Sequence, residues 1–430
     1  MPMKIKNFEA LAVTGLRKVA LEIMEAGLEA IDTSKIIQEN IKIDGNKLII
    51  KDKSFLLDTS GRIFILGVGK CASAAASALS NILGNKITDG VVIDSNPGRD
   101  LKKIRVFQGD HPYPTERNIK AAGEIISMLQ NLKGEDLVIM IISGGGSTML
   151  CHPEGFSCED EGVLLKYLFE SGATIQEINT IRKHLSSARG GHLAEYAYPA
   201  RVVSLLFSDI PGENLEFIAS GPSVLDTTTR ADAEVVLKNY QVKEKCGLNV
   251  SPHLLETPKD KKFFEKVEYI TIVSNQTALD AMAAKAGESG LVVKVCSSCL
   301  TGEARQVAVK ILDEMYHTPS KTVLLFGGET TVKVKVKGKG GRSQELALAA
   351  LSFIKPGEII LPFASDGWDN TESAGAICDI MTKEKAEKEG LDPADFLERN
   401  DSYNFFKKTK DTVITGLTGS NVSDLIIALK

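Results

Sequence analysis

Residues 62–79 constrain the fold most strongly, because an apolar run leads directly into a glycine turn. The segment reads RIFILGVGKCASAAASAL. Gly67, Gly69 and Ala72 have the G-x-G-x-x-A spacing of a turn that binds a dinucleotide between a strand and a helix. Lys70 lies inside this turn. The segment therefore predicts a Rossmann-like strand, turn and helix, and it fits either a nicotinamide cofactor or another phosphate chemistry.

Short apolar runs alternate with helical patterns along the rest of the chain. Such runs are typical of a parallel sheet with helices on both faces. A second alternation of strands and helices begins at Tyr269. At 430 residues the chain is also too long for one ordinary core. We therefore expect two α/β domains, at 1–250 and 265–430, with ligands bound in the cleft between them at strand ends.

The composition argues against several classes of partner. Basic and acidic residues number 51 and 56, the formal net charge is -5, and no long run of one sign occurs, so no nucleic-acid partner is expected. No window approaches the roughly 20 apolar residues that span a bilayer, and the N-terminus lacks the apolar core of a secretory signal. Seven scattered cysteines suit a reducing compartment. We expect a cytoplasmic protein that does not contact membranes.

A second glycine-rich turn, ISGGGSTML, follows the apolar run DLVIMI. Three successive glycines remove the β-carbons from the turn, so that backbone N–H groups can converge on an anion. Neighbouring hydroxyl groups add further donors. We expect this turn to bind phosphate through Ser143, Gly144, Gly145, Gly146, Ser147 and Thr148.

Charged residues mark four further places. Asp209 and Asp366 each follow an apolar strand directly, where a carboxylate can bind Mg²⁺, take a proton or cap the next helix. Glu329 precedes VKVKVKGKG, which reads as a basic hairpin, and Arg342 then opens a helix whose dipole also attracts phosphate. Arg182 belongs to a basic cluster that suits either a carboxylate or phosphate ligand or a solvated helix face.

Taken together, the motifs resemble the glycerate 2-kinase family, whose C-terminal part is called the MOFRL domain. Eight motifs occur in the family's order: GVGKCA, GDHPYPTERN, ISGGGSTML, INTIRKHLSSARGGHLAE, SDIPGENLEFIASGPS, GGETTVKVKVKGKGGRSQELALA, SDGWDNTESAGA and TGLTGSNVSDL. The resemblance implies a Rossmann-like N-terminal domain with a mostly parallel sheet, a smaller MOFRL-type α/β domain, and an active site in the interdomain cleft. It also implies ATP-dependent conversion of D-glycerate to 2-phosphoglycerate with Mg²⁺ or another divalent cation.

The family's key lysine matches Lys70, and its key arginine matches Arg342. Phosphoryl transfer requires in-line oxygens and neutralised charge, which a lysine and an arginine can supply. We further expect Asp209 to orient or deprotonate the glycerate hydroxyl group, and Arg182 to bind the glycerate carboxylate. Asp366 and Glu329 are the expected metal ligands. The sequence leaves a monomer and a homodimer open.

The alternative function is an NAD(P)H-dependent hydroxypyruvate reductase. Asp94 ends the next apolar run about 20 residues after the first glycine turn, where an acid that binds ribose belongs. However, a G-x-G-x-x-A match alone is weak, and the several separate anion-binding turns exceed the needs of one dinucleotide. The residues therefore favour the kinase.

Overall fold

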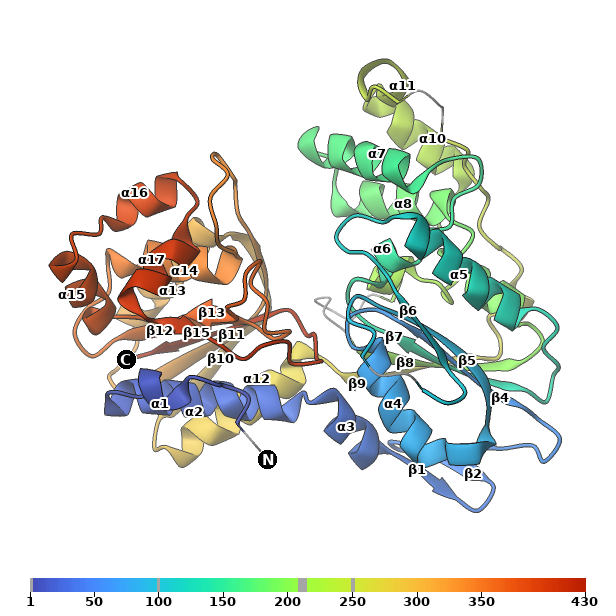
Figure 1. The fold of residues 1–430 in the computed structure, drawn as a ribbon, viewed down its shortest axis with the longest axis horizontal. Coiled ribbons are helices and arrows are strands. Elements are labelled where there is room, and N and C mark those ends of the chain that lie inside the picture. Colours follow the sequence, from blue (N-terminus) through green and yellow to red (C-terminus); the bar gives the residue numbers. More distant parts are fainter. Residues whose placement is uncertain (1–2, 99–100, 208–214, 249–251) are drawn as a thin grey trace. The chain divides into compact units, whose positions relative to one another are not determined.

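A computed structural model of the chain describes residues 3–98, 101–207, 215–248 and 252–430. These residues form two compact units (Figure 1). The parallel-sheet unit contains residues 33–98, 101–207, 215–248 and 252–272, and the mixed-sheet unit combines residues 3–32 with 273–430. No helix within the described ranges is long and apolar enough to cross a membrane.

In the part of the chain that the structure describes, the parallel-sheet unit is built on six strands in the order β6-β5-β4-β7-β8-β9. In chain order this is 3-2-1-4-5-6, the order of a Rossmann fold, which confirms the predicted N-terminal fold. Strands β4 and β7 are buried along their whole length and pair in parallel, as expected for apolar runs covered on both faces. The strands are β4 (Ile63–Val68), β5 (Ile87–Asp94), β6 (Arg105–Gln108), β7 (Leu137–Ile142), β8 (Arg201–Phe207) and β9 (Val267–Val273).

Helices and a small sheet complete this unit. The antiparallel sheet is made of β1 (Ile41–Asp44), β2 (Lys47–Ile50) and β3 (Lys53–Leu56). The helices are α3 (Thr33–Asn40), α4 (Ala72–Leu83), η1 (Gly84–Lys86), α5 (Glu116–Leu129), α6 (Gly146–Met149), α7 (Cys158–Glu170), α8 (Ile175–Leu185), α9 (His192–Ala197), η3 (Ile218–Ser220), α10 (Arg230–Asn239), α11 (Val242–Lys245) and η4 (Lys261–Phe263). Leu164, Ile181 and Val236 belong to a separate apolar cluster that joins α7, α8 and α10.

The described residues of the mixed-sheet unit form a sheet of seven strands, with six in the order β10-β11-β16-β12-β13-β15 and β14 paired with β12. Strands β10 and β11 are parallel, whereas β16 runs antiparallel to both β11 and β12. The strands are β10 (Val292–Glu303), β11 (Thr322–Thr331), β12 (Ile359–Ala364), β13 (Gly375–Ala376), β14 (Cys378–Asp379), β15 (Thr412–Val413) and β16 (Asp424–Leu429). This second sheet confirms the α/β character predicted for the C-terminal part.

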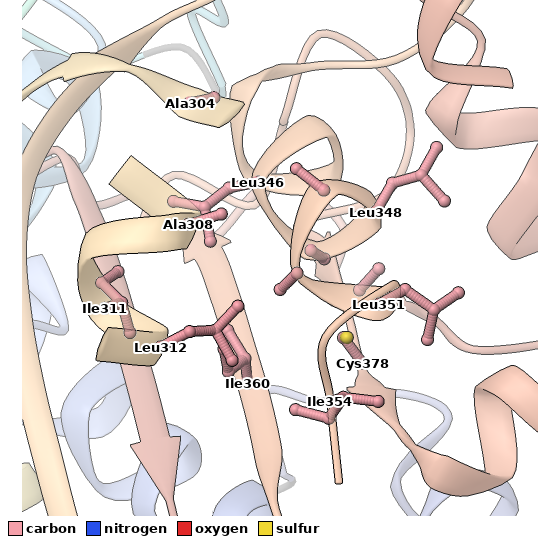
Figure 2. Packing of buried hydrophobic residues seen from close by; sticks show 14 of the residues in the cluster. Ala304, Ala308, Ile311, Leu312, Leu346, Leu348, Leu351, Ile354, Ile360 and Cys378 are labelled. Carbon is pink, nitrogen blue, oxygen red and sulfur yellow. The ribbon is translucent and has the colours of Figure 1, made fainter. Parts of the chain in front are cut away.

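Helices cover both faces of this mixed sheet (Figure 1). One side carries α1 (Phe8–Leu11), α2 (Gly15–Ala30) and α12 (Asn275–Glu288). The other helices are α13 (Ala304–Tyr316), α14 (Arg342–Leu351), α15 (Ile380–Lys388), α16 (Pro393–Glu398) and α17 (Ser402–Thr409). Figure 2 shows the core on that second side, where Ile311 and Leu312 of α13 lie in one buried cluster with Leu346 of α14 and Ile360 of β12. The cluster includes residues 346–351 of α14 and so packs this helix against the sheet.

The division into compact units differs from the predicted domains at two elements. Helix α2 packs against α12 and the mixed sheet rather than within a domain ending at residue 250. Strand β9, expected in the second domain, extends the parallel sheet beside β8. Both elements lie next to a unit boundary in the chain, and the apolar surface available for packing decides which sheet they join.

The expected basic hairpin at VKVKVKGKG is not formed. Residues 332–341 contain no strand and lie as an irregular segment between β11 and α14. Val334 and Val336 are 68% and 53% exposed, so the alternation of valine and lysine does not separate a buried face from a solvated one. Without a buried face or a partner strand, the pattern does not produce a sheet.

Candidate functional site

The two glycine turns of the parallel-sheet unit meet between β4 and β7. The backbone N–H of Lys70 donates to the carbonyl oxygen of Gly144 at 3.0 Å, and the N–H of Ser143 donates to the carbonyl oxygen of Val68 at 3.0 Å. In a 3-2-1-4-5-6 sheet the strand order reverses between the first and fourth strands, and ligands bind there at the carboxyl ends. Lys70 thus lies at the topological switch point of this sheet.

The close approach of the turns depends on glycine. Gly69 has φ +117°, and a Cβ atom there would overlap the Ser143 hydroxyl and backbone. Gly145 has φ +84°, and a Cβ atom there would lie 3.5 Å from Cγ of Lys70 and 3.3 Å from Cδ2 of His111. Both φ values lie in the region that favours glycine. The Lys70 side chain therefore passes directly beside the second turn.

The hydroxyl groups predicted to bind phosphate have different surroundings. Ser143 is fully buried, and its Oγ accepts a hydrogen bond from the Cys71 N–H at 3.4 Å, which ties the two turns together. Thr148 is buried and donates to the carbonyl oxygen of Pro112 at 3.4 Å. Ser147 is half-buried, and its Oγ accepts from the Ser220 hydroxyl at 3.0 Å.

The Gly146 N–H donates to the carbonyl oxygen of Ser143, and this hydrogen bond stabilises the turn. Gly144 is buried, and Gly145 is partly exposed. Gly145 and Ser147 are therefore the residues of this turn that reach the surface.

Asp94 does not have the environment of an acid that binds ribose. It is 1% exposed, and its carboxylate accepts N–H groups from Ser73 and Asn96, each at 2.9 Å. Burial raises the pKa of Asp94 to about 6, although these hydrogen bonds oppose the rise. Its carboxylate binds a backbone N–H group in the first turn of α4. Asp94 therefore no longer supports the reductase, for which it was the best evidence in the sequence.

Arg182 lies in a buried cluster rather than on a solvated helix face. Its neighbour Arg189 donates to Glu161 at 2.8 Å and to the carbonyl oxygen of Arg182 at 3.2 Å. The Nε atom of Arg182 has no hydrogen-bond partner among the described residues. Burial and, to a lesser extent, the charge of Arg189 lower the pKa of Arg182 to about 10. The cluster thus leaves the buried Nε atom of a half-buried arginine with capacity for an acceptor.

Arg342 is the first residue of α14, and two carboxylates hold its guanidinium group. Nε and Nη2 donate to Oδ2 and Oδ1 of Asp424 at 2.5 and 3.1 Å, and Nη1 donates to Glu329. Burial lowers the pKa of Arg342, but the charges of Asp424 and Glu329 outweigh burial and raise it. Arg342 therefore stays cationic and has a defined orientation.

Two aspartates of the turn at residues 366–369 have different partners. Asp369 is buried and accepts the N–H groups of Ser343 and Gln344 at 3.1 and 2.8 Å, which caps the start of α14. Burial raises the pKa of Asp369. Asp366 is half-buried, and one of its oxygens accepts the N–H of Trp368 at 2.9 Å.

The predicted metal ligands do not form a ready-made metal site. Across the described ranges, no group of three or more His, Cys, Asp or Glu side chains could hold a metal ion. Glu329 pairs with Arg342, and Asp366 offers a single carboxylate. Mg²⁺ is commonly bound through one or two carboxylates together with substrate phosphates, so Asp366 fits that limited role. Asp209 lies outside the described residues.

Asp424 and Asp369, the carboxylate partners of Arg342 and of its helix, are not among the residues predicted from the sequence. Asp424 begins an apolar strand, and Asp369 lies three residues after Asp366 in the same acidic turn. An acid next to a buried strand was the one local signal available for Asp424. Nothing local relates it to an arginine 82 positions away.

Two family models match the chain. Residues 19–255 match a domain of unknown function, DUF4147, and residues 322–424 match the MOFRL family. A "Glycerate 2-kinase" of Pyrococcus horikoshii is 36% identical over 96% of this chain and 97% of its own length. A "D-glycerate 2-kinase" of Thermotoga maritima is 37% identical over 96% of this chain and 98% of its own length.

Solved structures agree with these relatives. The crystal structure of a glycerate kinase from Thermotoga maritima matches with a TM-score of 0.80 and 35% identity, covering 96% of this chain and 98% of that chain. Two proteins from Agrobacterium vitis, each 36% identical over 85% of this chain, carry hydroxypyruvate reductase as a provisional name. The near-complete coverage by the kinases and the two matching family models show that this chain belongs to the glycerate 2-kinase family.

Proposed function

We propose that this chain transfers the γ-phosphoryl group of ATP to the 2-hydroxyl group of D-glycerate, giving 2-phosphoglycerate and ADP. The observation that carries the proposal is the junction of the Lys70 turn with the Gly144 turn at the switch point of a Rossmann-ordered sheet. The names of the full-length relatives support it. The hydrogen bonding of Asp94 supports the kinase over the reductase.

Each glycine turn has a role in this proposal. The partly exposed Gly145 and Ser147 bind phosphate, while Ser143 and Thr148 hold the turn in shape. Lys70 supplies positive charge to the transferred phosphoryl group, because phosphoryl transfer depends mainly on positioning and on charge neutralisation.

Arg342 would bind a phosphate group, because its fork of N–H donors suits phosphate oxygens. Asp366 would offer one carboxylate to a divalent cation carried by ATP, and the cation would neutralise phosphate charge. Arg182 would bind the glycerate carboxylate. Asp209 remains the predicted residue for the substrate hydroxyl group. A cytoplasmic location and a monomer or homodimer also remain predictions.

One assay tests the reaction itself. Purified protein is incubated with D-glycerate, ATP and Mg²⁺, and in parallel with hydroxypyruvate and NADH, and the products are identified by NMR. We expect 2-phosphoglycerate in the first mixture. Oxidation of NADH without any phosphorylated product would instead establish the reductase.

Substitutions test the residues. Lys70→Ala and Arg342→Ala should each lower kcat by about 100-fold or more, because each removes a charge that stabilises the transition state. Lys86→Ala and Arg399→Ala remove exposed cations from elsewhere in the chain and serve as matched controls. If kcat stayed within a few fold of wild type in either test variant, the proposed role of that residue would be abandoned.

A further inference from the structure

The two carboxylates that hold Arg342 differ sharply in burial. The Asp424 side chain is 5% exposed, the Arg342 side chain is 32% exposed, and the Glu329 side chain is 52% exposed. Asp424 contacts Nε and Nη2, whereas Glu329 contacts Nη1. A buried carboxylate, Asp424, therefore binds one edge of the guanidinium group, and an exposed carboxylate, Glu329, binds its remaining nitrogen, Nη1.

The backbone explains why Asp424 is the fixed partner. Asp424 begins β16 and lies opposite Gly328 of β11 on one side and opposite Ala364 of β12 on the other. Its position is thus set by two neighbouring strands. Glu329 follows Gly328 on β11 and carries a longer, solvent-exposed side chain.

The two ion pairs also differ in how readily they can be exchanged. An exposed pair of a carboxylate and an arginine contributes little to stability, because water screens both charges. A buried bidentate pair is costly to break, because one partner is left as an uncompensated charge. A ligand can therefore take the place of Glu329 much more readily than that of Asp424.

We infer that Asp424 is a positioning residue that orients Arg342, and that Glu329 competes with a phosphate oxygen of ATP for Nη1 of the same guanidinium group. A carboxylate oxygen and a phosphate oxygen are both anionic acceptors that the arginine fork binds in the same way. The inference rests on the role proposed above for Arg342 and adds the two residues that control it.

The experiment measures kcat and the KM values for ATP and D-glycerate in two variants of the full chain. In Asp424→Asn, one acceptor oxygen becomes an NH₂ group that cannot accept from the guanidinium. We expect kcat to fall about 100-fold while the KM for D-glycerate stays within about twofold, because the arginine is misplaced and the substrate site is not. In Glu329→Gln, the KM for ATP should fall by up to about fivefold, the effect of losing an exposed ion pair.

Glu345→Gln is the matched control. Glu345 is also a buried carboxylate and lies in the first turn of α14, but it accepts a hydrogen bond from Arg305 at 2.8 Å instead of from Arg342. If Asp424 had only a structural role, Asp424→Asn and Glu345→Gln would both lower the midpoint of thermal unfolding. The two variants would then have similar kcat values. A kcat for Asp424→Asn no lower than that of Glu345→Gln would therefore overturn the positioning role.

The exposed Glu329 variant keeps the inference testable if Asp424→Asn does not fold. An unchanged or raised KM for ATP in Glu329→Gln overturns the competition and with it the inference. Arg342→Gln separates this failure from that of the proposed function. Full activity of Arg342→Gln would overturn the proposed role of Arg342 itself. Loss of activity in Arg342→Gln would support that role, independently of the results for Asp424 and Glu329.

Discussion

Arg17, in the first long helix, donates two hydrogen bonds of 2.6 Å each to the carboxylate of Asp379, 362 residues later in the chain. A third bond, from Nη1 to Asp411, measures 2.7 Å. All three side chains are almost completely buried. Burial lowers the pKa of Arg17, and the two aspartates more than reverse this effect. This cluster joins α2 to the C-terminal part of the mixed-sheet unit.

Arg17→Met should lower the free energy of unfolding by about 3–5 kcal/mol, because it leaves the buried carboxylate of Asp379 without its cation, while Asp411 keeps its ion pair with Lys385. Urea unfolding followed by circular dichroism measures the change. Arg399→Met, which removes an exposed i,i+4 partner of Asp395, should cost no more than about 0.5 kcal/mol. Equal losses in the two variants would show that the buried cluster is not needed for docking of α2.

Gly69→Ala should reduce both stability and kcat, because the new Cβ pushes the Ser143 turn away from Lys70. Gly45→Ala is the control: Gly45 also has a positive φ, +58°, but no atom of the described residues lies within 4 Å of its added Cβ. The control should lose only the strain of the left-handed backbone, about 1–2 kcal/mol, and should keep its kcat. Thermal unfolding and initial rates separate the two effects. Normal kcat in Gly69→Ala would contradict the importance of the turn contact.

Asp94 should make stability depend on pH. Its pKa is raised to about 6 in the folded protein from 3.8, so the folded state binds a proton more tightly than the unfolded state. The stabilisation is therefore complete below about pH 4 and is lost as the pH rises through about 6. The full difference is on the order of 3 kcal/mol.

Asp94→Asn should remove this dependence. Urea unfolding of wild type and Asp94→Asn at about pH 4 and about pH 7 measures it, because other groups affect both proteins equally. The wild type should lose stability relative to the variant on going to the higher pH. Parallel behaviour of the two proteins would mean that Asp94 is not the source.

Asp369→Ala should destabilise the start of α14 by about 2 kcal/mol, because it leaves the N–H groups of Ser343 and Gln344 without their acceptor. It should also lower kcat, since Arg342 is the first residue of that helix. Thr229→Ala removes the exposed cap of α10 and should cost about 1 kcal/mol without any effect on kcat. Chemical unfolding and steady-state kinetics check both expectations. A wild-type kcat in Asp369→Ala would show that capping of α14 by Asp369 is not needed for catalysis.

Much of the sheet could be predicted because its signal is local. Each central strand, such as 63–68 or 137–142, is a continuous apolar run that is buried on both faces. The turn around Lys70 was predictable for the same reason, since its glycines are close together in the chain. The run VKVKVKGKG had the right alternation for a strand, but a strand also needs a partner and a buried face, which the alternation alone does not supply.

The sequence by itself determined the alternation of strands and helices, the two glycine turns and the placement of Lys70 and Arg342 at the ends of elements, because backbone preferences and apolar periodicity act between near neighbours. The tertiary structure alone decided that α2 joins the mixed sheet, that Asp94 serves α4, and that Arg342 is held by Asp424 and Glu329. These outcomes depend on contacts between residues far apart in the chain. Burial and charge pairing select those contacts, and neither can be read from a local sequence pattern.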